Sequence, residues 1–335
     1  MSTATPSPER LRILIVTPAL LSSTSGNAVT AQRYASFFRS ARWKVFLAGD
    51  YRGENVDVLV ALHARKSAAA VLAFRRQHPD RAIVVVLTGT DLYRDLPRSA
   101  AARRALSAAT AVVTLQPLGL QRIPQRIRRK GQSIVQSAPA FTQPSRRRKK
   151  EKADLRVCVI GHLRAEKDPF RAARAAKSLP KGMKVCVDQA GRALAPRYAA
   201  AARREMRRNA RYRWRGELSA YAARRLLCSS DAMVISSIME GGANVVCEAI
   251  ACGVPIFASH IPGNIGILGA RYPGFFPVRD TKALAKLMRR AVEQPSFLRR
   301  LRSWIVRLRP LVNPVRERRA WIGLISALAA RRSGK

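Results

Sequence analysis

Long apolar runs, secretory signals and paired cysteine motifs are missing from this sequence, and each absence excludes a class of protein. No stretch reaches the roughly 18 consecutive apolar residues of a transmembrane helix. Residues 1–9 contain neither the basic nor the apolar segment of a secretory signal. The five cysteines show no C-x-x-C spacing, which argues against a zinc site or a disulfide framework. We therefore expect a cytoplasmic protein with reduced thiols.

Acidic residues are also scarce, and this leaves a large positive charge. Only 20 Asp and Glu residues balance 63 Lys and Arg residues, so the formal net charge is +43. Such a charge attracts polyanions. The arginines are spread along the whole chain, however, without aromatic interleaving, zinc-finger spacing or an RNA-binding signature. We therefore expect no specific nucleic-acid partner, and at most a weak association with polyanions or an anionic membrane surface.

Short apolar segments rich in β-branched residues alternate with helical patterns, which is typical of buried parallel strands joined by helices. The predicted strands of the first half are residues 11–18, 44–49, 56–62, 82–87, 111–115 and 133–136. A proline- and charge-rich segment follows at 139–152, and the predicted strands resume at 155–160, 183–187, 212–214, 232–235 and 255–259. The pattern predicts an α/β chain of two Rossmann-like, doubly wound parallel-sheet domains, residues 1–145 and 146–310, with a cleft between them.

The connecting segments also carry predictions. Residues 30–39 and 118–128 have the apolar spacing of helices, residues 22–27 form a polar turn, and residues 261–269 form a glycine-rich turn. No G-x-G-x-x-G follows the first strand, so the sequence does not support a dinucleotide fingerprint.

The clearest candidate site follows the predicted strand at 232–235. Gly241 and Gly242 lack a Cβ, so a ligand can approach the backbone closely, and they precede a predicted helix at 245–251. A helix N-terminus offers free N–H groups and a positive dipole, which together bind phosphate. The turn consists of Glu240, Gly241, Gly242, Ala243 and Asn244.

Two carboxylates border this anion-binding turn. Glu240 begins it and Glu248 lies in the helix that follows. Carboxylates cannot hold phosphate, but they accept hydrogen bonds from sugar hydroxyls. The site therefore predicts a ligand with both phosphate and hydroxyl groups, as in a nucleotide sugar. A pair of hydrolytic carboxylates flanking a glycosidic bond is the competing interpretation, and the anion-binding turn argues against it.

The first half supplies a second set of candidates at predicted strand ends. His63 follows the strand at 56–62 and Asp91 follows the strand at 82–87, at the sheet edge where α/β folds bind ligands. A single histidine is more often structural, but the pairing with Asp91 favours a functional role. The candidate acceptor side comprises Arg65, Lys66, Gly26 and Asn27, with Arg33 as a further cation on the first helix.

The second half carries a longer motif that resembles the EX7E signature of retaining GT-B glycosyltransferases, family 4 in particular. The matching residues are Ser237, Glu240, Gly241, Glu248, Ala249, Gly253 and Pro255. The resemblance implies a GT-B fold in which a broken C-terminal helix, about residues 311–335, packs back on the first domain. It also implies that Arg164 and Lys167 grip the donor diphosphate. The family has arginine directly after the glycine of this loop, whereas this sequence has His162 there.

In the same resemblance, His63 matches the histidine that ends a strand of the first domain and faces the donor sugar. We therefore predict catalytic roles for His63, Glu240 and Lys167, and Asp91 joins them because its predicted strand end faces the same crevice. Glu248 is best placed for the ribose hydroxyls, and Glu240 for the hydroxyls of the sugar. Electrostatic stabilisation of the leaving diphosphate by Lys167, Arg164 and backbone N–H groups needs no divalent metal, and no Asp-x-Asp motif stands in a suitable place. We therefore expect no metal and no cofactor.

Several segments also resemble the selenosugar synthases of selenoneine biosynthesis. These are SGNAVTAQR, LHARKSA, LTGTDLYRDL, GHLRAEKDPFRAA, RYRWRGEL and MEGGANVVCEAIACGVPIFASHIPGNIGILG. This resemblance implies transfer from a UDP-sugar, typically UDP-N-acetylglucosamine, to selenophosphate. Two alternatives stay open: a family 4 enzyme that acts on a sugar, lipid or small-molecule hydroxyl, and a basic protein that uses a GT-B shell to bind nucleic acid or a membrane surface.

Overall fold

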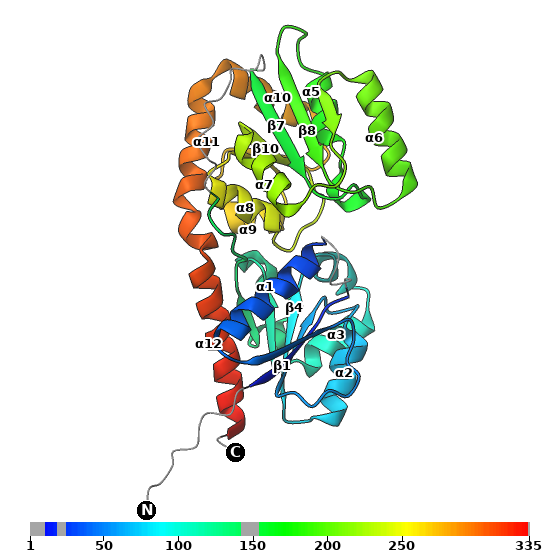
Figure 1. Ribbon diagram of the computed structural model, residues 1–335, viewed down its shortest axis with the longest axis vertical. Helices are drawn as coiled ribbons and strands as arrows, with labels where there is room; N and C mark the ends of the chain where they lie inside the picture. Colours follow the sequence, from blue (N-terminus) through cyan, green and yellow to red (C-terminus); the bar gives the residue numbers. More distant parts are fainter. Residues whose placement is uncertain (1–10, 19–24, 142–153, 334–335) are drawn as a thin grey trace, which may run out of the picture. The chain divides into compact units, whose positions relative to one another are not determined.

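The computed structural model describes residues 11–18, 25–141 and 154–333, and the chain forms two compact units (Figure 1). Unit 1 contains the described residues up to Val135 together with those from Val315 onward, and unit 2 contains Gln136–Pro314. Each unit has its own six-stranded sheet, and all strand pairs in both sheets are parallel. The prediction of an α/β chain with two parallel sheets is therefore confirmed.

Unit 1 has the strand order β2-β1-β3-β4-β5-β6. Its strands are β1 (Arg12–Val16), β2 (Lys44–Ala48), β3 (Val58–Leu62), β4 (Ala82–Leu87), β5 (Ala111–Thr114) and β6 (Gly131–Ser133). Its α-helices are α1 (Gly26–Ser40), α2 (Ala68–Gln77), α3 (Ala100–Ala108), α4 (Gln125–Arg128) and α12 (Pro314–Ser333). A π-helix, η1 (Asp91–Asp95), follows β4, and a 3-10 helix, η2 (Pro117–Arg122), follows β5.

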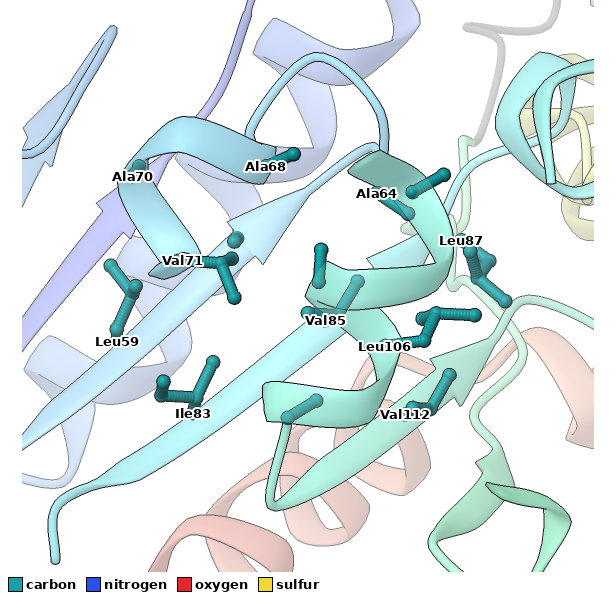
Figure 2. Close-up of a cluster of buried hydrophobic side chains, with 14 of the residues drawn as sticks. Leu59, Ala64, Ala68, Ala70, Val71, Ile83, Val85, Leu87, Leu106 and Val112 are labelled. Atoms are coloured by element: carbon teal, nitrogen blue, oxygen red, sulfur yellow. The ribbon is translucent and has the colours of Figure 1, made fainter. Parts of the chain in front are cut away.

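Both faces of this sheet are apolar because helices cover both. Alternate strand residues such as Leu59, Ile83 and Val85 point to one face, where they meet Val71 of α2 and Leu106 of α3 (Figure 2). The intervening strand residues point to the other face, against α1 and α12. Near-continuous apolar strands follow from this arrangement, as expected for a parallel sheet that is buried on both sides.

Helix α12 is attached to unit 1 through aromatic side chains and an ion pair. Trp321 is fully buried, with its ring centroid 4.3 Å from that of Tyr34 and 6.0 Å from that of Phe38. Glu317 of α12 lies 3.1 Å from the guanidinium Nε of Arg33 on α1. The C-terminal helix therefore contributes Trp321, Ile325 and Leu328 to the core on this face of the first sheet.

Unit 2 has the strand order β12-β11-β10-β7-β8-β9. Its strands are β7 (Leu155–Ile160), β8 (Val185–Ala190), β9 (Tyr212–Trp214), β10 (Ala232–Ile235), β11 (Ile256–Ser259) and β12 (Phe275–Phe276). Its helices are η3 (Ala165–Lys167), α5 (Arg171–Lys177), α6 (Pro196–Arg208), α7 (Ala220–Ser229), α8 (Asn244–Cys252), α9 (Pro262–Leu268), α10 (Thr281–Glu293), α11 (Pro295–Arg307) and η4 (Arg309–Val312).

Each sheet has one point at which the strand order reverses. In unit 1 the chain leaves β1 toward β2 and returns to β3 on the other side, and in unit 2 the strands β7 and β10 are related in the same way. A crevice opens outside the carboxyl ends of strands at such a point, and α/β folds bind their ligands there. The topology therefore predicts that a ligand site lies at the segments that follow β3, β7 and β10.

Two predicted connections and one predicted strand differ from the structure. Residues 118–128 are not one helix, because Pro124 separates η2 from α4 and lacks the N–H that a continuous helix needs. The predicted turn at 261–269 is the helix α9, with Pro262 at its first position and Gly269 ending it at φ +86°. The last strand of unit 1 is Gly131–Ser133 rather than residues 133–136.

The predicted turn at 22–27 differs from the structure at residues 25–27, the part of it that the structure describes. Gly26 and Asn27 are the first two residues of α1, and the Ser25 hydroxyl caps this helix by accepting a hydrogen bond from Ala28 N–H at 3.3 Å. The rest of that turn, and most of the predicted linker at 139–152, fall at residues 19–24 and 142–153, which are outside the described ranges.

Candidate functional site

A small hollow lies at the switch point of the second sheet. It holds about 280 Å³ of space, part of which is open to solvent, and the carboxyl ends of β7 and β10 form its walls. The residues that line it are Val159, Ile160, Gly161, Lys167, Pro169, Gln189, Val234, Ile235, Ser236 and Ser237. Among the residues predicted from sequence, Lys167 therefore lies at the hollow itself.

An ion pair joins two of the predicted site residues. The Lys167 Nζ donates to Glu240 Oε1 at 2.6 Å, and the side chains are 22% and 11% exposed, respectively. A charge-assisted hydrogen bond between partly buried groups is stronger than one between neutral groups. The two residues are 73 positions apart in the sequence, so the fold alone brings them together.

The loop that carries Lys167 is held by the loop that carries Glu240. The hydroxyl of Ser236 donates to the carbonyl oxygens of Lys167 and Asp168 at 3.1 and 3.0 Å. The Ile238 N–H donates to the carbonyl oxygen of Glu166 at 2.9 Å. These contacts join the segments after β7 and β10 and fix the backbone from which the side chain of Lys167 extends.

Gly263 allows a close approach that sequence reasoning missed. A Cβ at this position would lie 2.1 Å from the carbonyl oxygen of Glu240, so only glycine lets α9 pack against the backbone of Glu240. The segment 261–269, which the sequence predicted as a glycine-rich turn, is in fact this helix. Helix α9 therefore supports the position of Glu240 from behind.

The glycine-rich turn leads into α8 as predicted. Ala243 is the N-cap residue of this helix, and its side chain makes no cap hydrogen bond. Gly242 and Ala243 are buried, and Asn244 is half-buried. Glu248 is half-buried in the second turn of α8, and Gly253 ends the helix at φ +70°. The helix N-terminus and one carboxylate thus belong to the same element.

The predicted partner of Lys167 in diphosphate binding is more open. The side chain of Arg164 is 42% exposed, and its Nε lies 4.0 Å from Glu166 Oε2. His162 stands where the family has arginine, and its Nδ1 accepts a hydrogen bond from Arg192 N–H at 3.2 Å. Desolvation by burial lowers the pKa of His162 below its usual value. His162 is therefore a neutral group that joins two loops, and Arg164 is the available guanidinium.

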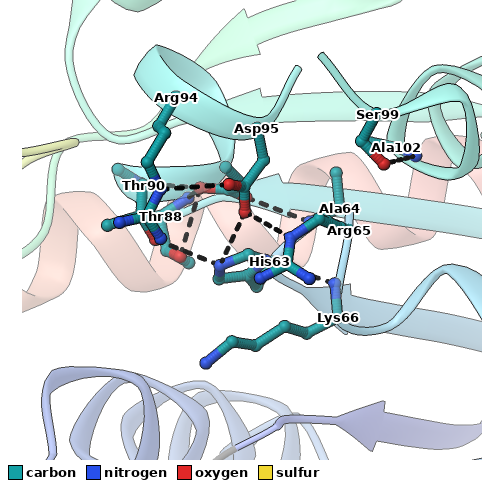
Figure 3. A network of polar contacts seen from close by, with 12 residues as sticks. His63, Ala64, Arg65, Lys66, Thr88, Thr90, Arg94, Asp95, Ser99 and Ala102 are labelled. Atoms are coloured by element: carbon teal, nitrogen blue, oxygen red, sulfur yellow. Dashed lines mark hydrogen bonds and ion pairs between the residues drawn. The ribbon is translucent and has the colours of Figure 1, made fainter. Parts of the chain in front are cut away.

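His63 lies in a polar network at the switch point of the first sheet (Figure 3). Its backbone has φ +74°, a conformation that is uncommon for a residue with a side chain. Its Nδ1 accepts a hydrogen bond from Lys66 N–H at 3.3 Å, and its Nε2 lies 3.1 Å from the hydroxyl oxygen of Thr90. The neutral ring therefore carries its proton on Nε2 and donates it to Thr90.

Asp91 holds the loops of this network with both carboxylate oxygens. Its side chain is fully buried; Oδ2 accepts from Ala64 N–H at 3.0 Å, and Oδ1 accepts from the N–H groups of Thr88 and Gly89 at 2.9 and 2.8 Å. A carboxylate that binds the backbone N–H groups of two loops fixes the positions of those loops. In the arrangement seen here, Asp91 is a positioning residue for the segment that begins with His63.

Asp95 is a member of the network that the sequence reasoning did not identify. Its carboxylate accepts from the Nε groups of Arg65 and Arg94 at 2.7 and 3.2 Å, and it lies 3.8 Å from His63 Nε2. Burial opposes ionisation of Asp95, but the two arginines outweigh it and lower the pKa of its carboxyl group. Its spacing of four residues from Asp91 was the available signal, because both lie in η1.

The cations of the predicted acceptor side divide into two groups. Arg65 is 43% exposed and belongs to the His63 network, and Figure 3 shows the side chain of Lys66 extending away from that network. Arg33 is different: it is only 16% exposed and lies against Glu317 between α1 and α12. Gly26 and Asn27 start α1. The structure therefore brings the side chains of His63, Arg65, Asp91 and Asp95 together, joins Lys66 to them through its backbone N–H, and gives Arg33 a structural role.

Burial of His63 predicts a pH-dependent stability. Desolvation lowers the pKa of the imidazole, with a smaller contribution from Lys66 in the same direction, and these outweigh Asp91 and Asp95. The unfolded chain takes up a proton below about pH 6.5, whereas folded His63 does so only at lower pH. Stability is therefore complete above pH 6.5 and falls below it, by up to about 1.4 kcal/mol per pH unit.

The variant His63→Asn tests this expectation, because asparagine tolerates a positive φ and does not titrate. Urea unfolding at pH 7, 6 and 5 should show the wild type losing stability relative to the variant as the pH falls. A difference that stays constant across this range would show that folded and unfolded His63 titrate alike.

In the described parts of the chain, no group of three or more His, Cys, Asp or Glu side chains is arranged to hold a metal ion. The same described residues contain no helix that is both long enough and apolar enough to span a membrane.

Comparison with known proteins finds a family match in the second half of the chain. Residues 141–304 match the family model of the glycosyl transferases group 1. The structure is similar to that of Anabaena Alr3699/HepE in complex with UDP and glucose, with a TM-score of 0.76 and 15% identity over 95% of this chain and 100% of that one.

Two other structures have similar values. Sucrose-phosphate synthase (tll1590) from Thermosynechococcus elongatus has a TM-score of 0.74 and 15% identity, covering 96% of this chain and 100% of its own. A glycosyltransferase from Rickettsia africae ESF-5 has a TM-score of 0.73 and 13% identity, covering 96% and 99%. These similarities extend over both units, and they confirm the predicted GT-B fold.

Proposed function

We propose that this protein transfers a sugar from a UDP-sugar, because residues 141–304 match the family model of the glycosyl transferases group 1. The observation that carries the proposal is the pairing of Lys167 with Glu240 beside the N-terminus of α8, at the switch point of the second sheet. A cation and the positive end of a helix dipole suit a diphosphate, and the carboxylate suits sugar hydroxyls. The relative described as a complex of HepE with UDP-glucose favours UDP-sugars as the donor class.

The proposed chemistry follows from where charge develops. When the bond between the anomeric carbon and the diphosphate breaks, the diphosphate gains negative charge. Lys167, Arg164 and the N–H groups at Gly241, Gly242, Ala243 and Asn244 stabilise that charge. Glu240 exchanges its contact with Lys167 for hydroxyls of the donor sugar, so the ammonium becomes available as the donor arrives. Preorganised donors of this kind act without reorganisation at the moment of reaction.

Glu248 is proposed to accept hydrogen bonds from the ribose hydroxyls of UDP. It is half-buried in the second turn of α8, the helix whose N-terminus is proposed to face the diphosphate. A carboxylate that accepts two hydroxyl donors contributes about 1.5–3 kcal/mol per bond. The assignment gives a measurable difference between ribose and deoxyribose ligands.

The variant Glu248→Ala is expected to bind UDP at least tenfold more weakly, because each lost charge-assisted hydrogen bond is worth about that factor. Calorimetric titration with UDP measures the change, and Glu293→Ala on the exposed surface of α10 is the matched control. Full UDP affinity in Glu248→Ala would refute the ribose assignment.

For the acceptor, the proposal is selenophosphate, with UDP-N-acetylglucosamine as the donor and a selenosugar as the product. The support from the first unit is cationic: Arg65 and Lys66 lie in the segment that follows β3, and Asp95 is the shared ion-pair partner of Arg65 and Arg94, so one carboxylate faces two guanidinium groups. A small, multiply charged anion suits such a cluster. A sugar or lipid hydroxyl as acceptor is the alternative, and a cytoplasmic location is proposed with either.

The experiment is incubation with UDP-N-acetylglucosamine and selenophosphate, followed by mass spectrometry for a selenosugar and for UDP. Formation of both products supports the full proposal. Release of UDP only when a hydroxyl acceptor is supplied would overturn selenophosphate and keep the glycosyltransferase. No binding of UDP and no turnover of any UDP-sugar would overturn the enzymatic proposal as a whole.

A further inference from the structure

Gln136 makes a long-range contact with the glycine-rich turn. It is the first residue of unit 2, lies ahead of the segment that matches the family model, and is only 2% exposed. Its side-chain amide Nε2 donates to the carbonyl oxygen of Gly242 at 2.5 Å, across 106 residues of sequence. A buried amide group needs partners, and here one partner is the backbone of the predicted donor site.

This hydrogen bond orients the whole peptide unit between Gly242 and Ala243, and not only the carbonyl group that accepts it. The carbonyl of Gly242 and the N–H of Ala243 belong to the same peptide unit, and no cis peptide bond occurs among the described residues. In a planar trans peptide the C=O and N–H bonds point in opposite directions. With Gln136 on the carbonyl side, the N–H of Ala243 is directed away from Gln136, and no acceptor for it occurs within the described ranges.

Ala243 is also the N-cap of α8, so this N–H adds to those at the helix N-terminus. If this peptide plane could rotate, the Ala243 N–H and the Gly242 carbonyl could exchange directions. The carbonyl carries partial negative charge and repels phosphate, whereas the N–H attracts it. The glycines on this turn make such rotation easy, because they tolerate most backbone conformations. A fixed contact on the carbonyl side therefore has an electrostatic consequence.

The far end of α8 is held by the segment through which the chain leaves unit 2. The 3-10 helix η4 packs on α8, and the guanidinium of Arg309 lies against Gly253 at the C-terminus of α8. The Ala138 N–H donates to the carbonyl oxygen of Val312 at 3.1 Å, which joins this segment to the one that carries Gln136. The two segments that border unit 2 thus support α8 at both ends.

We propose that Gln136 is a positioning residue for the donor diphosphate. It holds the Gly242–Ala243 peptide with its N–H toward the phosphates and its carbonyl away from them. The inference rests on the proposed function, since it assigns to Gln136 a part in binding the UDP moiety. It predicts that Gln136 affects ligands that carry the diphosphate and leaves the nucleoside contacts unchanged.

The test compares UDP with uridine by calorimetric titration. The variant Gln136→Leu keeps the size of the side chain and removes its donor, and we expect it to bind UDP about tenfold more weakly with uridine affinity unchanged. In the transferase assay, KM for the UDP-sugar should rise and kcat should fall. The variant Gln136→Glu cannot donate at neutral pH and also repels phosphate, so its effect on UDP binding should be larger.

Gln116→Leu is the matched control. Gln116 is fully buried in unit 1 and donates to the hydroxyl oxygen of Tyr93 at 2.9 Å, so the substitution removes a comparable hydrogen bond away from the turn. We expect it to leave the ratio of UDP to uridine affinity unchanged. Thermal unfolding of each variant separates folding from binding, and Gln136→Glu serves if Gln136→Leu fails to fold.

The outcomes distinguish this inference from the proposed function. If the wild type binds UDP and both Gln136 variants keep the wild-type ratio of UDP to uridine affinity, the positioning role is wrong and the function stands. If both affinities fall together in the variants, Gln136 is a purely structural residue and the inference is also overturned. If the wild type binds no UDP, the proposed function fails first.

Discussion

Replacement of Lys167 by alanine is expected to lower kcat for the UDP-sugar about 100- to 1,000-fold, the usual cost of removing one preorganised donor to a developing negative charge. The ammonium group lines the hollow between β7 and β10 and is held 2.6 Å from Glu240. Its removal leaves the carboxylate of Glu240 without its cation in a site that is only 11% exposed. Steady-state kinetics with saturating donor measure the effect.

Lys177→Ala is the control for this variant. Lys177 is an exposed lysine at the end of α5, on the same unit, and its loss should leave kcat within a factor of two of the wild type, as for most surface substitutions. The double variant of Lys167 and Glu240 should be far less impaired than the product of the single effects predicts, because the two side chains are in direct contact. Independent effects of the two substitutions would show that they do not act as a pair.

Replacement of Trp321 by alanine is expected to destabilise unit 1 by about 3–5 kcal/mol, the range measured for large aromatic side chains removed from a core. The ring is fully buried and lies against both Tyr34 and Phe38. A cavity of this size at the contact between α12 and α1 leaves the surrounding aromatic groups without partners.

Equilibrium unfolding in urea, followed by far-ultraviolet circular dichroism, measures this change. Val315→Ala lies on the same helix at a site that is 49% exposed, and it should change stability by no more than about 0.5 kcal/mol. A Trp321→Ala protein as stable as this control would mean that α12 contributes little to the first unit.

Much of the fold follows from local pattern. The segments that form β3 and β4 are apolar over five and six residues, because helices cover both faces of the sheet. Short apolar runs of this kind are typical of buried parallel strands, so the strands could be predicted from them. The glycine-rich turn ahead of α8 could also be predicted from the sequence. Two adjacent glycines, Gly241 and Gly242, before a helical pattern indicate a flexible backbone at a helix N-terminus, and this can be recognised without knowing the distant residues.

Helix α9 shows where local pattern was misleading. Residues 261–269 contain a proline and three glycines, which favour a turn, yet Pro262 stands at the first helical position, where it is tolerated. Gly263 is required there by contact with Glu240, which lies on another loop. The tertiary contact overrode the weak helix propensity of the segment.

The sequence by itself determined the two parallel sheets and the glycine-rich turn that leads into α8, because apolar periodicity and glycine act over a few neighbouring residues. Only the tertiary structure decided that Lys167 pairs with Glu240, that Asp95 gathers Arg65 and Arg94, and that Gln136 holds Gly242. Two of these three contacts join residues more than 70 positions apart. Their partners are set by strand order and loop packing, and no single stretch of sequence contains that information.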